Sequence, residues 1–151
     1  RLAQRKDVQM AWPLHPNPDV RRVVLSRLST TPNVSLLPPL DYADFIDLLA
    51  GSDLTLTDSG GVQEEAPSLG TPALVLREST ERPEAIEAGT SILVGCDAAK
   101  IGAAAERLLD DRDELPWRSR IHSPYGDGCA APRIVAALRD LMGLETLAAA
   151  G

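Results

Sequence analysis

The clearest chemical signal in the sequence is the segment Asp58-Ser59-Gly60-Gly61, which follows a short apolar run and opens a helical pattern. The two glycines let a ligand approach the backbone, and the free N–H groups at a helix start favour an anion such as phosphate. Ser59 adds a hydroxyl donor, and a carboxylate from Glu64 or Glu65 could accept hydrogen bonds from a ribose diol. The same residues also fit a structural interpretation, with Asp58 or Ser59 as a cap, a tight glycine turn and glutamates that complement the helix dipole.

Other candidate residues carry the same ambiguity. His15, at the end of an apolar run, could bind phosphate or act as an acid or base, or it could be structural. Phe45 lies on an apolar helical stripe, which favours core packing over stacking on a base. Arg77 and Arg82 bracket a loop that also contains three glutamates, so both ion pairing and anion binding fit. No Ser/His/Asp or Cys/His arrangement has usable spacing, and local chemistry nominates neither a catalytic residue nor a metal site.

Short apolar runs alternate with amphipathic stretches along the chain and should position these residues. Tyr42, Phe45, Ile46 and Leu49 show the helical i, i+3, i+4, i+7 spacing, and Gly51 supplies a stop. We expect strands over residues 8–12, 34–37, 54–57, 73–76 and 92–94. We expect helices over residues 18–28, 42–49, 60–69, 83–88, 101–109 and 134–142.

This alternation predicts an α/β fold, a Rossmann-like parallel sheet with helices on both faces. The strands are almost continuously apolar, as expected for parallel strands that are covered on both sides. Ligands bind at the carboxyl ends of such strands, which selects the loops 15–18, 58–61 and 77–84.

Composition excludes several classes of protein. The chain has 151 residues and a net charge of −7, with no run of about 20 apolar residues that could span a membrane. An acidic chain with two Trp, two Tyr and one Phe is a poor candidate for a nucleic-acid surface. Cys96 and Cys129 lie far apart without a metal-ligand motif, which indicates reduced thiols in a cytoplasmic protein.

The expected domain covers residues 1–142, and residues 143–151 form a tail. The chain begins at Arg1 without an initiator Met and with no signal peptide, in a segment that reads as the end of a helix. It is therefore either a trimmed complete domain or a piece of something longer, and composition does not decide between them.

Read together, the loops resemble the C-terminal half of a non-hydrolysing UDP-N-acetylglucosamine 2-epimerase. The DSGG-QEE and TERPEA blocks in this order are far more specific than a single glycine pair, and the resemblance covers about residues 8–141. The matching stretches are HPNPDVR (15–21), PLDYADF (39–45), TDSGGVQEEAPSLGTPALVLRESTERPEAIEAGT (57–90), LVG (93–95) and SPYGDGCA (123–130).

The resemblance implies the C-terminal half of a GT-B-type architecture, in which two Rossmann-like domains enclose a nucleotide sugar. Such enzymes interconvert UDP-N-acetylglucosamine and UDP-N-acetylmannosamine by eliminating UDP and adding it back, with no cofactor. By position, Ser59 and the N–H groups of Gly60 and Gly61 would hold the diphosphate, Glu65 the ribose hydroxyls, and Phe45 the uracil. In bacterial members, the position of His15 is associated with a second, regulatory molecule of UDP-N-acetylglucosamine. Arg82 would lie near the cleft.

The resemblance also implies what the chain lacks. The family's catalytic carboxylates belong to its N-terminal domain and its catalytic histidine to a GHR-type loop upstream, so we expect no catalytic residue and no epimerase activity here. The strand before that loop is an inner strand of the sheet, and its absence would leave backbone groups unpaired. We expect a homodimer for the full-length protein. Two alternatives remain, namely a GT-B glycosyltransferase domain that uses a UDP-sugar, and a non-catalytic nucleotide-sugar-binding module.

Overall fold

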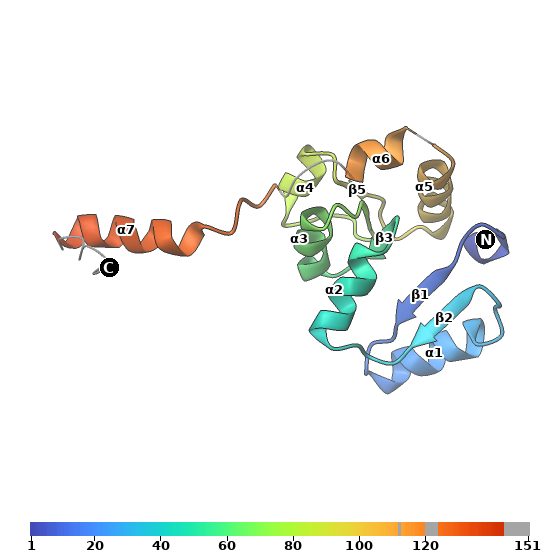
Figure 1. Cartoon of the computed structure of the whole chain (residues 1–151). Helices are drawn as coiled ribbons and strands as arrows, with labels where there is room; N and C mark the ends of the chain where they lie inside the picture. The colour runs from blue at the N-terminus through green and yellow to red at the C-terminus, as the bar shows by residue number, and fades with distance from the viewer. Residues whose placement is uncertain (112, 120–123, 144–151) are drawn as a thin grey trace.

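Short parallel strands and helices alternate along the chain in the computed structural model, which describes residues 1–111, 113–119 and 124–143 (Figure 1). The strands are β1 (Met10–Pro13), β2 (Val34–Leu37), β3 (Thr55–Thr57), β4 (Ala73–Val75) and β5 (Ser91–Leu93). The α-helices are α1 (Pro18–Leu28), α2 (Tyr42–Ala50), α3 (Gly60–Ser68), α4 (Pro83–Glu87), α5 (Ala98–Asp110), α6 (Glu114–Ser119) and α7 (Ala130–Met142). All of the expected strands and helices are present, with ends that differ by a few residues.

The strands form two parallel sheets rather than the single sheet expected from the sequence. β1 pairs with β2, with Met10 opposite Val34, and the second sheet has the order β3-β4-β5, with Leu74 of β4 between Leu56 and Ile92. Neither β1 nor β3 is paired on its other side within the described residues. An absent inner strand would leave such a break, but that expectation stays a prediction.

Local sequence explains where the longer helices begin. Asn17, Asp41 and Asp97 each accept a hydrogen bond from a backbone N–H of the first turn, over 2.8–2.9 Å, at the starts of α1, α2 and α5. These side chains satisfy N–H groups that a helix leaves unpaired at its start. Pro18 and Pro83 occupy the first positions of α1 and α4, where the missing N–H of proline costs nothing.

The core lies on both faces of the β3-β4-β5 sheet. Ala73 of β4 packs with Leu49 of α2 and Ala66 of α3, whereas its neighbour Leu74 packs with Ala105 and Leu108 of α5. Successive residues of a strand point to opposite faces, so α2 and α3 cover one face and α5 covers the other. The prediction of helices on both faces of a parallel sheet is therefore confirmed for this part of the chain.

Two short elements were not expected, a 3₁₀ turn η1 (Leu2–Gln4) and helix α6. The start of the chain is thus a 3₁₀ turn rather than the end of an α-helix. α7 extends away from the other elements, and none of its residues is buried (Figure 1). No helix in the described ranges is both long and apolar enough to cross a bilayer. The expected tail, apart from Gly143, and Ser123 of the expected turn lie outside the described residues.

Candidate anion-binding site at the start of α3

The amino end of α3 leaves its polar groups available to a ligand. Ser59 occupies the cap position, but its side chain makes no capping hydrogen bond, and its own N–H donates to Thr57 Oγ1 over 3.0 Å. Neither Gly60 nor Gly61 has a positive φ, so no left-handed turn requires a glycine there. Ser59 is thus the cap residue, as the structural interpretation expects, but its side chain is not used for capping, and the glycine pair is not required by a left-handed conformation.

The need for glycine at position 60 is explained by the lack of space for a side chain, and not by its backbone conformation. A Cβ atom at Gly60 would lie 2.9 Å from Nη1 and 3.2 Å from Nη2 of Arg82, so the guanidinium rests directly against the start of α3. A Cβ at Gly61 would meet only Ser59 Oγ, at 3.9 Å. Gly61 therefore leaves an open approach to the backbone, while Gly60 leaves room for a cation beside it.

Two carboxylates hold the Arg82 guanidinium. Arg82 Nε donates to Glu64 of α3 and Arg82 Nη1 donates to Glu81, each over 2.5 Å. The hydrogen bond to Glu64 raises the pKa of Arg82. A backbone hydrogen bond and the guanidinium of Arg77, 2.8 Å away, lower the pKa of Glu81, so this acid stays ionised. The ion pairing expected in this loop is confirmed, and anion binding by the same arginines stays a prediction.

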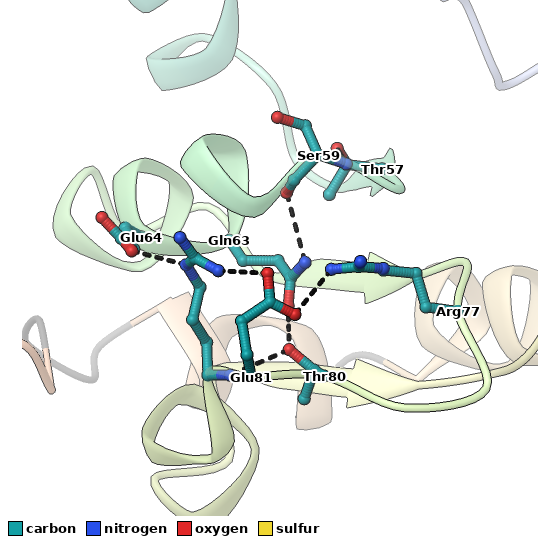
Figure 2. Close-up of polar contacts among 8 residues, drawn as sticks. Thr57, Ser59, Gln63, Glu64, Arg77, Thr80 and Glu81 are labelled. Carbon is teal, nitrogen blue, oxygen red and sulfur yellow. Dashed lines mark hydrogen bonds and ion pairs between the residues drawn. The ribbon is translucent and has the colours of Figure 1, made fainter.

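Sequence reasoning missed Gln63, which lies beneath the site. Its side chain is buried in the first turn of α3 and donates from Nε2 to the Ser59 carbonyl oxygen over 3.2 Å. Its Oε1 accepts a hydrogen bond of 2.6 Å from the Thr80 hydroxyl, which joins α3 to the loop after β4 (Figure 2). A glutamine between Val62 and Glu64 carries no local signal of this, because Thr80 is 17 residues away.

Glu64 and Glu65 differ in whether the carboxylate already has a partner in the protein. The Glu64 carboxylate is engaged by Arg82, whereas the carboxylate of the half-buried Glu65 forms no hydrogen bond or ion pair with the described residues. A carboxylate without a protein partner can accept hydrogen bonds from a ligand's hydroxyl groups. The local ambiguity between the two glutamates is thus reduced, with Glu65 the one available to a ribose.

Phe45 belongs to α2 and is half-buried against the cluster of Leu49, Ala66 and Ala73. Packing in the core, as expected from its place on the apolar stripe, is therefore confirmed. A ring that is only partly covered keeps a surface on which a base can stack, so the implied contact with uracil stays a prediction.

His15 lies apart from these residues in the fold. It follows β1 in the other sheet, is exposed, and accepts a hydrogen bond from the Asn17 N–H at Nδ1 over 3.1 Å. This contact orders the turn into α1, and it involves Nδ1 but not Nε2 of the imidazole. The structure does not bring His15 into hydrogen-bonding contact with Ser59, Glu65 or Arg82.

The SPYGDG segment, which looked like only a turn, reaches the site through Tyr125. Burial and the nearby Glu84 raise the pKa of the Tyr125 hydroxyl, and the backbone of Ala85 in α4 hydrogen-bonds it. The charges of Glu64 and Arg82 also act on Tyr125, so this ring lies on the α4 side of the candidate site. No local sequence pattern signalled this placement.

A separate hollow of about 400 Å³ lies where β4 and β5 end. Its lining includes Arg77 and Glu78 from the loop after β4, together with Asp97 and Lys100 at the start of α5, but no residue of α3. Glu78 already accepts a hydrogen bond from the Cys96 N–H. Across the described ranges, no group of His, Cys, Asp and Glu side chains is placed to hold a metal ion.

Comparison with known proteins identifies the family to which this fold belongs. The chain is a Rossmann-like α/β protein whose structural neighbours are UDP-GlcNAc 2-epimerases. The sequence profile of the UDP-N-acetylglucosamine 2-epimerase family matches residues 1–139. The chain therefore belongs to the UDP-N-acetylglucosamine 2-epimerase family.

Relatives and solved structures agree with this assignment. The UDP-N-acetylglucosamine 2-epimerase of Salmonella typhimurium is 51% identical over 137 residues, which are 91% of this chain and 36% of that protein. The structure of Staphylococcus aureus MnaA with UDP has a TM-score of 0.89 at 41% identity, and covers 95% of this chain and 40% of its own. The Neisseria meningitidis UDP-GlcNAc 2-epimerase bound to UDP-GlcNAc has a TM-score of 0.82 at 44% identity, over 87% of this chain and 36% of its own. The chain thus spans little more than a third of the length of these relatives.

Proposed function

We propose that this chain is the UDP-binding part of an enzyme that interconverts UDP-N-acetylglucosamine and UDP-N-acetylmannosamine. The observation that carries the proposal is the amino end of α3. There Ser59, whose side chain makes no capping hydrogen bond, and the glycine pair lie beside the guanidinium of Arg82, which Glu64 holds in place. Two similar structures hold UDP or UDP-GlcNAc, which supports the same ligand class here. All the comparisons reported above are with epimerases, so a glycosyltransferase is not favoured.

In this proposal each binding residue has a role fitted to its surroundings. The N–H groups of Gly60 and Gly61 and the hydroxyl of Ser59 donate to the diphosphate, where the dipole of α3 favours negative charge. The carboxylate of Glu65 accepts from the ribose hydroxyls. The exposed part of the Phe45 ring lies against the uracil, and Arg82 adds a positive charge beside the phosphates.

The proposed reaction removes UDP from the sugar and adds it back after a proton has returned to the other face of C2. This chain holds the leaving group, whose charge develops as the bond to C1 breaks. The groups that move the proton belong to a part of the full-length protein that precedes this segment. The chain alone should therefore form no UDP-N-acetylmannosamine, and turnover near that of a full-length enzyme would refute this.

Calorimetric titration of the chain with UDP tests the binding roles. Ser59→Ala and Glu65→Ala should each weaken the affinity by about tenfold, because each removes a hydrogen bond to a charged or hydroxyl group of the ligand. Glu87→Ala is the matched control, since Glu87 is an exposed acid at the end of α4. Unchanged affinity in both site variants would show that UDP is not held at α3.

A second arm tests the open approach at Gly61. Gly61→Ala adds a methyl group where only Ser59 Oγ lies within 4 Å, so the fold should tolerate it. The same methyl group would stand where the diphosphate meets the backbone, and UDP affinity should fall. Full affinity in Gly61→Ala would place the phosphates elsewhere.

A further inference from the structure

We propose that the buried side chain of Gln63 is a positioning residue that acts through Thr80 to hold Arg82 over the amino end of α3, and so sets how tightly the diphosphate binds. This inference rests on the proposed function and concerns the same site. It adds two residues, Gln63 and Thr80, which lie in the DSGG-QEE and TERPEA blocks but had no role assigned to them from the sequence. Neither side chain needs to touch UDP for the proposal to hold.

The first step is the orientation of the Gln63 amide. Gln63 is only 1% exposed, so an unpaired amide group there would be costly. The Ser59 carbonyl oxygen can only accept a hydrogen bond, so the group that faces it at 3.2 Å must be the amide nitrogen. The amide oxygen then faces the Thr80 hydroxyl at 2.6 Å and must accept from it. Both ends of this amide are satisfied in one orientation only.

The second step passes from Thr80 to Arg82. The hydroxyl of Thr80 has a single proton, and this proton is donated to Gln63. The Thr80 oxygen therefore accepts from the backbone N–H of Arg82, which lies 3.1 Å away. Hydrogen bonds thus run without a break from the Ser59 carbonyl to the main chain of Arg82, and each one fixes the direction of the next (Figure 2).

The third step concerns what remains free on Arg82. Its Nε and Nη1 are engaged by Glu64 and Glu81, whereas Nη2 forms no hydrogen bond with the described residues. Nη1, Cζ and Nη2 would lie 2.9, 3.0 and 3.2 Å from a Cβ atom at Gly60, so the guanidinium as a whole lies against the amino end of α3. The side chain is thus held at two nitrogens, the main chain is held through Thr80, and the N–H groups of Nη2 are left for an anion.

Such a hold matters because the strength of a charged hydrogen bond depends steeply on geometry. A displacement of about 1 Å is enough to lose most of what a positioned group contributes. The loop 77–82 carries Arg82 and meets α3 through the partly buried contact between Gln63 and Thr80. Loss of that contact should let Arg82 leave the phosphates even though the arginine itself is unchanged.

The experiment measures UDP affinity of the whole 151-residue chain by calorimetry in Thr80→Val, Thr80→Ser and Gln63→Met. Valine and methionine keep the size of the side chains but cannot form the hydrogen bonds, so UDP should bind about tenfold more weakly. Serine keeps the hydroxyl, so Thr80→Ser should bind like the unaltered chain. Thr71→Val is the matched control, because it also removes a buried threonine hydroxyl, one that donates to the Leu49 carbonyl away from the site.

Coupling to Arg82 separates positioning from general damage. If Thr80 acts through Arg82, then Thr80→Val should cost little further affinity in a chain that already carries Arg82→Ala. An equal loss in both backgrounds, or an equal loss in Thr71→Val, would overturn the inference and leave UDP binding at α3 intact. Failure of the unaltered chain to bind UDP would instead overturn the proposed function, and this inference with it.

Discussion

The β3-β4-β5 sheet and the β1-β2 sheet are built from strands of three or four residues, yet they differ sharply in how they are covered. Every residue of β4 is buried, with α2 and α3 on one face and α5 on the other. No residue of β1 or β2 is fully buried, and Trp12 of β1 is 46% exposed. The candidate phosphate contacts all follow β3 and β4, so the site stands on the part of the chain with a two-sided core.

This difference in coverage indicates which loops should hold their side chains in fixed positions. Loops that leave a sheet packed on both faces have little freedom at their base, whereas loops that leave the β1-β2 sheet, in which no residue is fully buried, have fewer packed neighbours around them. α1 shows the same one-sidedness, since Val24 is its only buried residue while Val20, Val23 and Leu25 are exposed. The two regions should therefore respond differently to the same kind of substitution.

The largest contrast is expected between two leucines. Leu74→Ala, in the middle of the covered sheet with no exposed surface, should lower the free energy of unfolding by about 2–5 kcal/mol. Leu25→Ala, at 39% exposure on α1, should cost about 1 kcal/mol or less. Urea denaturation of both variants measures the difference, and equal costs would mean that the two regions are equally packed.

A smaller contrast is expected between two hydroxyl groups. The buried Thr71 donates to the Leu49 carbonyl over 2.8 Å, so Thr71→Val should cost about 1 kcal/mol of unfolding free energy. The exposed Ser26 donates to the Val23 carbonyl over the same distance, and Ser26→Ala should stay within about 0.5 kcal/mol of the unaltered chain. Thermal unfolding of the pair tests whether burial rather than hydrogen-bond length sets the cost.

A pH-dependent contrast is expected at α6, which closes one side of the covered sheet. Hydrogen bonds from Arg118, and from Arg107, hold the pKa of Glu114 below its ordinary value of 4.5. The stabilisation is therefore present above that value and lost as the pH falls through the lower folded pKa. Glu114→Gln should lower the free energy of unfolding slightly near neutral pH, by less than about 1 kcal/mol, with a small drop in melting temperature, and should have no such effect in strong acid.

The control for this prediction is Asp47→Asn, at an exposed acid of α2. Its melting temperature should follow that of the unaltered chain at every pH. If Glu114→Gln and Asp47→Asn give the same profile from neutral to acid pH, the Arg118 contact does not stabilise α6.

The smallest effect is expected at His15, which belongs to the less covered region. His15→Ala should change UDP affinity by less than about twofold, because no candidate phosphate contact lies on its sheet. Calorimetric titration beside Ser59→Ala checks this. A loss as large as that of Ser59→Ala would show that both regions bind the same UDP molecule, and that UDP contacts are not confined to the β3-β4-β5 region.

Local pattern was enough to predict the helices that have both a cap and an apolar stripe. α2 begins one residue after Asp41 and ends at Ala50, just before Gly51, because capping and amphipathic periodicity are local properties. The six-residue α6 has no apolar stripe of useful length, although the Asp111 carboxylate accepts hydrogen bonds from the N–H groups of Asp113 and Glu114 at its start. Arg118 hydrogen-bonds the Gly89 carbonyl, 29 residues away, and Glu114 pairs with two arginines. Only the folded chain brings those groups together.

The same distinction divides the site. The position of Ser59, Gly60 and Gly61 at the start of a helix could be predicted from the sequence, because it follows from the strand before them and the helix after them. The partners of Gln63 and Arg82 could not, since Thr80 and Glu64 lie 17 and 18 residues away in the chain. Likewise, a periodic apolar pattern predicts strands but not which strands pair, so the division into two sheets was not foreseen.

The position of β4 has a consequence for the timing of motions around the site. Among the strands in the described ranges, only β4 is hydrogen-bonded to a neighbour on each side. The amide protons of such a strand exchange with water only when the whole unit opens, whereas those of edge strands exchange through smaller local openings. Leu76, just beyond β4, still donates to the Thr57 carbonyl of β3, so the loop that carries Thr80 and Arg82 leaves a strand that should exchange more slowly than the edge strands of the described ranges. Any local opening at the candidate phosphate site should thus begin on the α3 side, ahead of the strand from which the arginine loop leaves.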